Sequence, residues 1–242
     1  MYGYSYAIVV GASSGIGEQL VKQLVVDGAK VAAVARRGDR LQQLVDDYPG
    51  QVLAFPHDVT EYGAVPALFQ DVAKQLGGLD LVIYAAGVMP AVSEHEYSFE
   101  KDYKMVEVNL LGGIAWLNEA ALRFENTKSG TIIGIGSVAG ERGRQGQPVY
   151  NTTKAALATY LEALRNRLSR HGVRVVTAKP GPTETEMTAH LHMKGMMSAA
   201  QTASIILAKS NKPREFFIKP THKIAFAIIR NIPSWVFRKL KI

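Results

Sequence analysis

Short apolar runs rich in β-branched residues alternate along this chain with longer segments of helical periodicity, and this alternation restricts the possible folds most strongly. Its spacing suits parallel strands joined by right-handed crossovers, with helices on both faces of the sheet. The predicted strands are residues 6–10, 30–35, 52–56, 79–84, 131–136, 173–178 and 215–218. The predicted helices are residues 16–27, 40–48, 65–76, 101–124, 150–170 and 198–208, the last capped by Ser198. We therefore predict one doubly wound α/β domain built on a seven-stranded parallel sheet.

Composition excludes several classes of protein. The 242 residues include no cysteine, which excludes disulfides, thiolate metal sites and cysteine nucleophiles. No apolar run approaches the roughly 18 residues that span a bilayer, and the run from Ile224 to Ile229 is only six residues long. The N-terminus lacks the basic flank of a signal peptide, so we expect it to belong to the fold and the protein to be cytoplasmic.

The net charge of +7 is confined to one end of the chain. From Phe216 to Ile242 there are six Lys or Arg and no Asp or Glu, whereas the remaining chain holds 22 basic and 21 acidic residues. The body is thus nearly neutral and has no basic motif interleaved with aromatic residues, which argues against a nucleic-acid-binding protein. We divide the chain into a domain at residues 1–220 and a basic, amphipathic extension at residues 221–242.

A glycine-rich turn follows the first predicted strand, with the sequence Gly11-Ala12-Ser13-Ser14-Gly15-Ile16-Gly17. Glycines let the backbone turn sharply and approach a pyrophosphate, while the helix start supplies free N–H groups and the positive end of its dipole. Glycine-rich turns between strand and helix also occur for packing reasons alone. At this place in a parallel sheet we predict a dinucleotide cradle in a Rossmann-like domain. Its candidate residues are Gly11, Ser13, Ser14, Gly15, Ile16 and Gly17.

The end of the second predicted strand distinguishes between the two nicotinamide dinucleotides. An acidic residue about 20 positions after the glycines normally holds the ribose 2′-hydroxyl of NAD. Here the strand ends in Arg36 and Arg37, and no acid occurs before Asp39. A guanidinium pairs with a 2′-phosphate in a bidentate manner, whereas a carboxylate would repel it. Two arginines at a strand end can also be merely solvated, but we favour NADP over NAD, bound through Arg36 with Arg37 assisting.

Tyr150 and Lys154 lie four residues apart at the start of a predicted helix and therefore share one face. An ammonium beside a phenol stabilises the phenolate and lowers the tyrosine pKa, as acid–base catalysis requires. Tyr97 and Lys101 have the same spacing and serve as a comparison pair. Only the first pair has a serine, Ser137, thirteen residues upstream and directly after a predicted strand, where parallel sheets bind their ligands.

Together these motifs resemble those of the single-domain short-chain dehydrogenase/reductase family over about residues 5–220. The matching segments occur in the family's order: Gly11 to Gly17, Asp58-Val59-Thr60, Ala86-Gly87, Val108-Asn109-Leu110, Gly136 to Gly140, Tyr150 to Lys154 and Pro180-Gly181. The resemblance implies an NADP(H)-dependent oxidoreductase that transfers a hydride between NADPH and a carbonyl or secondary alcohol. It also implies a homodimer or homotetramer in which the helices at 101–124 and 150–170 pack across a two-fold interface.

The resemblance further implies a role for each matching residue. Tyr150 would be the general acid/base, and Ser137 would position the reacting oxygen. Lys154 would hold the nicotinamide ribose and lower the pKa of Tyr150, and Asn109 would support a proton relay through Lys154. The other implied cofactor contacts are Asp58, Val59, Ala86, Gly87, Pro180, Gly181, Thr183 and Thr185.

Several of these residues have other possible roles. Asn109 can cap or kink a helix, Asp58 can be a turn residue, and Pro180-Gly181 can be a strand exit. Two positions also depart from the family's pattern. Tyr84 stands where an asparagine normally ties neighbouring strands together, which predicts altered bonding beside the cofactor, and Val10 stands where threonine is common. Neither change removes a group that performs the chemistry.

The segment after Pro180-Gly181, which in this family forms a mobile flap over the substrate, is rich in methionine. It carries Met187, Leu191, Met193, Met196 and Met197. Flexible methionines suit a fairly apolar substrate, although core or dimer packing would use them equally well. His190 and His192 have no metal-ligating partner in the pattern, so we expect no metal site.

Another class of protein has to be weighed against an enzyme, namely a cofactor-binding scaffold or regulator that kept the fold and lost catalysis. The set of Ser137, Tyr150 and Lys154 argues against it, because a pure binder needs no tuned tyrosine.

The extension at residues 221–242 interleaves apolar and basic side chains. Pro233 divides it into two short pieces, and Ser234 is expected to cap the second. Trp235 and Phe237 beside basic residues, with no acid, suit peripheral contact with an anionic membrane. Alternatively, the apolar residues cover a sheet edge or a neighbouring subunit while the charges face water.

Overall fold

The seven strands form one sheet in which every neighbouring pair is parallel, as the alternation predicts. The computed structural model describes residues 2–191, 193 and 195–240. The strand order β3-β2-β1-β4-β5-β6-β9 is that of a doubly wound Rossmann-like fold, so the predicted fold class is confirmed. The strands are β1 (Tyr6–Val10), β2 (Lys30–Ala35), β3 (Val52–Pro56), β4 (Leu81–Tyr84), β5 (Gly130–Ile135), β6 (Val173–Lys179) and β9 (Arg214–Phe217).

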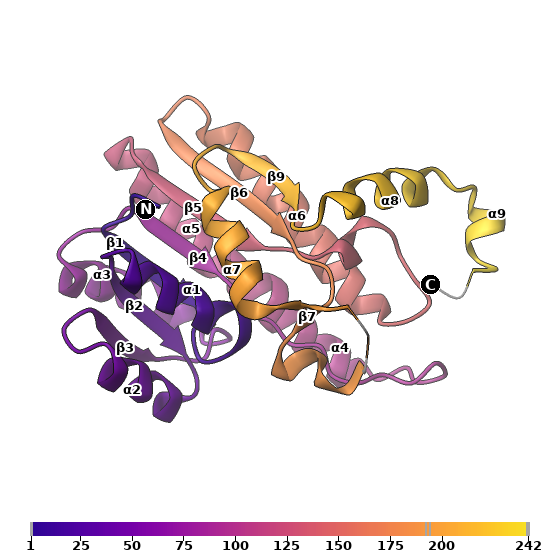
Figure 1. Cartoon of the computed structure of the whole chain (residues 1–242), viewed down its shortest axis with the longest axis horizontal. Coiled ribbons are helices and arrows are strands. Elements are labelled where there is room, and N and C mark those ends of the chain that lie inside the picture. Colours follow the sequence, from indigo (N-terminus) through magenta and orange to yellow (C-terminus); the bar gives the residue numbers. More distant parts are fainter. Residues whose placement is uncertain (1, 192, 194, 241–242) are drawn as a thin grey trace.

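Helices cover both faces of this sheet (Figure 1). One face carries α1 (Gly15–Val26), α2 (Gly38–Asp47) and α7 (Ala199–Ala208), and the other carries α3 (Val65–Leu76), α5 (Gly112–Thr127) and α6 (Pro148–Leu168). Consecutive strand residues point to opposite faces, so the core divides into two clusters. Within β1, Val9 packs in the first cluster and Ile8 in the second. The sheet is therefore buried on both sides, and its strand ends remain as the place for a site.

The single helix predicted at residues 101–124 consists of three segments in direct succession. Helices α4 (Phe99–Val106) and α5 flank a π-helical turn, η2 (Glu107–Leu111), in which Asn109 is fully buried. Such turns widen an α-helix and often occur at functional sites. Hydrophobic periodicity contains no signal for this turn. The turn nevertheless determines the position of Asn109, one of the predicted catalytic residues.

Tyr84 occupies the family's asparagine position without disturbing the sheet. It pairs with Val10 of β1 and Gly134 of β5 in the parallel register. Its hydroxyl donates to the carbonyl of Val108 at 2.5 Å, and burial raises its pKa. The phenol thus ties β4 to the π turn, and the parallel pairing of β4 with both neighbouring strands is intact.

Two further short strands, β7 (Thr183–Glu184) and β8 (Met197–Ser198), pair with each other and hold the ends of the predicted flap together. Helix α7 follows as predicted, because Ser198 and Gln201 form a reciprocal capping box at its start. The flap is therefore a closed loop.

After β9 the chain leaves the sheet as an arm of two helices, α8 (Pro220–Asn231) and α9 (Ser234–Phe237), which projects beyond the layers of the domain (Figure 1). The break falls at Pro233, as predicted, but Ser234 is the first helical residue of α9 and not its cap. The fixed backbone of Pro233 starts the helix instead. In the described part of the chain, no helix is long and apolar enough to cross a membrane.

A buried ion cluster joins the arm to the sheet. The side chain of Glu141, at the end of the short helix η3 (Val138–Glu141), is fully buried. Nζ of Lys179 lies 2.6 Å from Oε1 of Glu141 and 2.5 Å from Oε1 of Glu215. The other oxygen of Glu141 pairs with Arg230 of α8. Two cations thus compensate one buried carboxylate.

Replacing Lys179 by methionine should lower the free energy of unfolding by about 3 kcal/mol, because removing one partner leaves a buried carboxylate undercompensated. The matched control is Lys22→Met, which removes a partly exposed pair with Glu18 and should cost less than about 1 kcal/mol. Urea unfolding measures both values. Equal losses would show that the Glu141 cluster contributes no more than a surface pair.

Candidate active site

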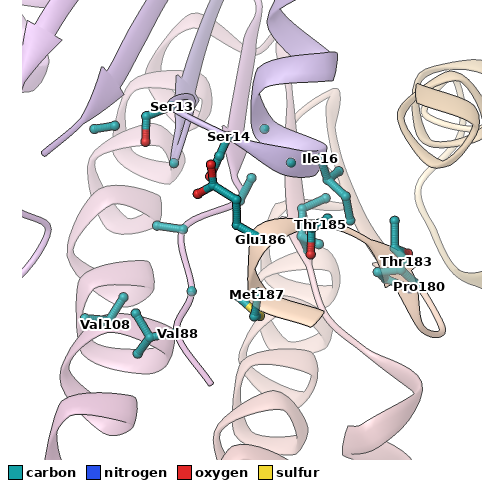
Figure 2. A pocket seen from close by; sticks show the side chains of 18 of the residues that line it. Ser13, Ser14, Ile16, Val88, Val108, Pro180, Thr183, Thr185, Glu186 and Met187 are labelled. Carbon is teal, nitrogen blue, oxygen red and sulfur yellow. The ribbon is translucent and has the colours of Figure 1, made fainter. Parts of the chain in front are cut away.

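A cleft runs along the edge of the sheet where the strands end, and most predicted site residues line it (Figure 2). The predicted residues on its wall are Gly11, Ser13, Ser14, Gly15, Ile16, Gly17, Arg36, Arg37, Val59, Ala86, Gly87, Ser137, Tyr150, Lys154, Pro180, Gly181, Thr183 and Thr185. Asp58 and Asn109 do not line it. The cofactor set and the catalytic set therefore share one cleft.

The glycine turn packs against the exit of β4 too closely for any side chain. A Cβ atom at Gly11, whose φ is +90°, would lie 2.4 Å from the backbone nitrogen of Ala86. A Cβ atom at Gly17 would lie 2.0 Å from the carbonyl oxygen of Gly11. These positions therefore require glycine. Packing alone accounts for both glycines, so support for a phosphate has to come from the start of α1.

The start of α1 borders the cleft. The first backbone N–H groups of this helix receive no hydrogen bond from the side chain of the N-cap residue. Ser14, the N-cap residue, makes no side-chain bond to the helix, and its hydroxyl accepts a hydrogen bond from Nη2 of Arg37 at 2.6 Å. A helix leaves its first N–H groups without internal partners and carries partial positive charge at that end. These groups fit an anionic pyrophosphate.

Arg36 and Arg37 make different contacts, and only Arg37 is bonded to the cradle. Nε of Arg37 donates to the Ser13 hydroxyl at 3.1 Å, in addition to its bond with Ser14. Arg36 instead pairs with Asp58, with 3.6 Å between Nη1 and Oδ2. Both arginines line the cleft, and the assignment of a 2′-phosphate to Arg36 with Arg37 assisting stays a prediction.

Asp58 organises the turn after β3. Its Oδ1 accepts hydrogen bonds from the backbone N–H of Thr60 at 3.0 Å and from the Thr60 hydroxyl at 2.9 Å. Burial raises the pKa of Asp58, but the two bonds from Thr60 and the charge of Arg36 outweigh it, so the pKa lies below its usual value. These contacts match the turn role, and contact with adenine stays a prediction.

Ser137 and Tyr150 meet on the wall of the cleft. Both side chains line it, and Oγ of Ser137 accepts from the N–H of Ala139 at 3.0 Å. Burial of the phenol raises the pKa of Tyr150, whereas the neighbouring Ser137 hydroxyl and the positive charge of Arg144 lower it. Burial has the largest effect, so the phenol is protonated at neutral pH and can donate a proton.

Lys154 is buried beside this pair. Its Nζ donates to the carbonyl of Ile135 at 3.0 Å and lies 5.7 Å from the centre of the Tyr150 ring. Burial lowers the pKa of Lys154 to about 8, so the ammonium is still the main form at neutral pH. The family resemblance implies that Lys154 lowers the pKa of Tyr150, but in this structure burial raises that pKa, and the groups that oppose the rise are Ser137 and Arg144.

Asn109 connects the π turn to the exit of β4 and to α6. Its Oδ1 accepts from the N–H of Val88 at 2.7 Å, and its Nδ2 donates to the Val88 carbonyl at 2.9 Å and to Oγ1 of Thr153 at 3.3 Å. A Cβ atom at Gly87 would lie 3.4 Å from Oδ1 of Asn109 and 3.5 Å from Nζ of Lys154. Asn109 and Lys154 therefore flank the same glycine, and a proton relay between them stays a prediction.

The comparison pair lies outside the cleft. Tyr97 is 92% exposed, and Nζ of Lys101 donates to the carbonyl of Ala91 at 2.7 Å and pairs with Glu96 at 2.5 Å. The same spacing of tyrosine and lysine therefore produces no site when the serine after a neighbouring strand is missing.

The structure adds residues that the sequence pattern did not single out. The additional residues on the wall are Ala35, His57, Ala85, Val88, Ile135, Glu186 and Thr188. His57 is buried against Trp116, with ring centroids 5.7 Å apart, and burial lowers its pKa. Its place directly before Asp58 is a signal that could have found it. Arg144, seven residues after Ser137, has no comparable signal.

The methionine-rich segment contributes unevenly to the cleft. Met187 lines it, whereas Leu191 and Met193 are exposed, at 38% and 48%. His192 lies outside the described residues. Within the described residues no three metal-ligating side chains gather into a possible metal site.

Comparison with known sequences identifies the family. The family model for short chain dehydrogenases matches residues 5–195, and the chain belongs to this family of oxidoreductases. An uncharacterized oxidoreductase of Staphylococcus aureus (strain MRSA252) is 34% identical over 184 residues, which cover 76% of this chain and 80% of that protein. An uncharacterized oxidoreductase of Myxococcus xanthus (strain DK1622) is 35% identical over 189 residues, which cover 77% of this chain and 75% of that protein.

Solved structures share the fold. ElxO with NADP bound superposes with a TM-score of 0.83 at 18% identity, covering 91% of this chain and 99% of that one. A short-chain dehydrogenase from Streptomyces avermitilis also has a TM-score of 0.83, at 22% identity, with coverage of 93% and 92%. The arrangement of sheet and helices is therefore the family's own.

Replacing Tyr150 by phenylalanine should lower turnover at least about a hundredfold, because only the transferable proton is lost. Cofactor binding should stay within about twofold of the parent, since the ring and its surroundings remain. Tyr97→Phe, in the comparison pair, should leave both quantities unchanged. Steady-state rates and cofactor titration measure the two effects, and a Tyr150→Phe protein with parental turnover would exclude this tyrosine as the proton donor.

Proposed function

We propose that this protein is an NADP(H)-dependent oxidoreductase that transfers a hydride between NADPH and a carbonyl or secondary alcohol. The observation that carries the proposal is a cleft in which Tyr150, Ser137 and Lys154 share the walls with the glycine turn. A binding scaffold would need the turn but would gain nothing from a buried lysine beside a desolvated tyrosine. The scaffold alternative is therefore weaker.

The residues of the cleft fit a phosphorylated dinucleotide. The open start of α1 suits the pyrophosphate, and Arg37 with the hydroxyl groups of Ser13 and Ser14 suits a 2′-phosphate. Bound there, NADPH would supply the hydride. ElxO, a protein of the same fold, was solved with NADP bound, which supports this choice of cofactor.

The side chains of the chain itself would manage the proton. Tyr150 would donate it to the substrate oxygen in reduction and take it back in oxidation, while Ser137 holds that oxygen by its hydroxyl. The positive charge of Arg144 and the Ser137 hydroxyl would favour the phenolate that forms after the transfer, since both lower the pKa of Tyr150. Measuring NADPH oxidation with a panel of ketones and aldehydes tests the proposal.

The substrate end of the cleft favours a fairly apolar molecule. Val88 and Met187 lie on its wall, and Cε of Met187 is 3.8 Å from the position of a Cβ on Gly87 (Figure 2). Thioether and aliphatic surfaces gain from burying apolar area and offer no partner to a charged group. The panel should therefore extend from small polar carbonyl compounds to large apolar ones.

Replacing Arg37 by alanine should weaken NADPH binding roughly ten- to a hundredfold, the loss of about 1.5–3 kcal/mol expected for a charge-assisted contact with phosphate. NADH binding should change little, because NADH lacks the 2′-phosphate. Arg36→Ala is the control and should have the smaller effect. Titration with both cofactors measures the ratio, and an unchanged ratio in the Arg37→Ala protein would contradict the assignment.

A further inference from the structure

Glu186 reaches from the flap to the cradle of the cofactor cleft, and its carboxylate lies near Ser14 (Figure 2). Its Oε2 lies 2.8 Å from Nη1 of Arg37, and its Oε1 lies 3.7 Å from Nη2 of Arg40. Arg37 foremost, with Arg40 and a bond from Ser14, holds the pKa of Glu186 below its usual value. The flap therefore presents an anion to the same arginine that contacts the cradle.

The flap backbone around Glu186 is held in place. A Cβ atom at Gly15 would lie only 3.0 Å from the methyl group of Thr185, so the flap packs directly on the start of α1. The hydroxyl of Thr188 donates to the carbonyl of Thr183 at 2.5 Å and closes the turn that carries Glu186. The exposed side chain of Glu186 can therefore turn away from Arg37 while the flap backbone stays where it is.

We infer that Glu186 is a specificity-determining residue whose carboxylate competes with the 2′-phosphate of the cofactor for Arg37, Arg40 and Ser14. The inference rests on the proposed NADP site. Carboxylate and phosphate both seek guanidinium donors, and two anions on one set of donors repel each other. NADPH has to displace Glu186, whereas NADH leaves the pair with Arg37 intact. Glu186 thus reduces the preference for NADPH that the arginines create.

The test is Glu186→Gln, which keeps the size of the side chain and removes its charge. Glu184→Gln is the matched control, because Glu184 lies two residues away in the same flap, is exposed, and has no ion pair among the described residues. The probes are 2′,5′-ADP and 5′-AMP, which differ only in the 2′-phosphate, followed by NADPH and NADH. Calorimetric titration gives each dissociation constant at low and at high salt.

Glu186→Gln should bind 2′,5′-ADP and NADPH about fivefold more tightly than the parent, the upper range for an exposed ion pair. Binding of 5′-AMP and NADH should change less than twofold, and Glu184→Gln should match the parent throughout. The gain should shrink at high salt, because the groups involved are exposed.

Three results would overturn the inference, and they are distinguishable from a failure of the proposed function. Unchanged affinity of Glu186→Gln for 2′,5′-ADP, or an equal gain for NADPH and NADH, removes the competition and leaves the NADP site standing. Failure of the parent and the variant alike to bind 2′,5′-ADP removes the NADP site and the competition together.

A separate observation concerns the outer face of the arm. The inner face of α8 packs on the domain, where Phe226 stacks on Phe217 with ring centroids 6.1 Å apart. The opposite face of α8 is uncovered, because Ile224 is 68% exposed and Ile228 is 62% exposed, and Trp235 of α9 is also exposed, at 63%. We call these three exposed side chains of the arm the docking face.

We propose that this docking face binds the surface of an anionic membrane. The exposed cations Lys223, Arg238 and Lys239 lie beside it in the chain, and no Asp or Glu occurs from Phe216 onward. Apolar side chains that include tryptophan, bordered by cations and free of carboxylates, match an anionic interface. A second copy of the chain would bring the same positive charges against the face, which disfavours self-association through it.

Co-sedimentation of the full chain with vesicles tests this, using phosphatidylcholine alone and with added phosphatidylserine. We expect binding only to the anionic vesicles, weaker at high salt, and at least a tenfold loss in Ile224→Ser/Ile228→Ser. The matched control is Val26→Ser/Leu122→Ser, which changes two exposed apolar residues on the domain, at 81% and 55%, and should bind like the parent. The proposal would be overturned if the parent bound no vesicles, or if both variants lost binding equally. It would also be overturned if only the arm variant showed a changed sedimenting mass in the absence of vesicles.

Discussion

The close approach of the turn after β1 to the exit of β4 is the constraint on which the site depends. The N–H of Gly11 donates to the carbonyl of Val34 at 2.8 Å, and the N–H of Ala85 donates to the carbonyl of Val10 at 2.8 Å. The turn is thus fastened to β2 on one side and to β4 on the other, at a separation that admits no Cβ atom at Gly11. Because Arg37 follows Val34 by three residues, the same fastening brings its guanidinium to the serines of the cradle.

Burial determines how the catalytic groups behave. Desolvation opposes the charged form of any group, so it raises the pKa of the Tyr150 phenol and lowers the pKa of Lys154. The two shifts run in opposite directions, so the phenol holds its proton more tightly than it does in water and the ammonium holds its proton less tightly. The ammonium has a fixed partner in the Ile135 carbonyl, so it is not an uncompensated polar group in the interior.

The fold could be predicted from the sequence because each strand and helix has its own periodic pattern of apolar residues. In addition, the connections between parallel strands are right-handed. The cradle and the set of Ser137, Tyr150 and Lys154 could be predicted because they follow strands whose ends must meet. Contacts between side chains that follow different strands could not be predicted from the sequence. Nothing in the pattern indicates that Arg37 contacts the cradle while Arg36 pairs with Asp58, or that Glu186 reaches Arg37 from 149 residues away. The π turn at Asn109 could not be predicted from the sequence either, because its residues have ordinary helical periodicity.

The arm is coupled to the site by charge and not by apolar packing alone. Glu141 follows Ser137 by four residues and is compensated by Lys179, which directly precedes Pro180, and by Arg230 of α8. The guanidinium of Arg142 lies 3.9 Å from the centre of the Phe237 ring and donates to the carbonyl of Ile229. The segment between Ser137 and Tyr150 is therefore held on one side by β6 and on the other by the arm. In this structure the arm is thus a structural neighbour of the catalytic segment as well as a surface of its own.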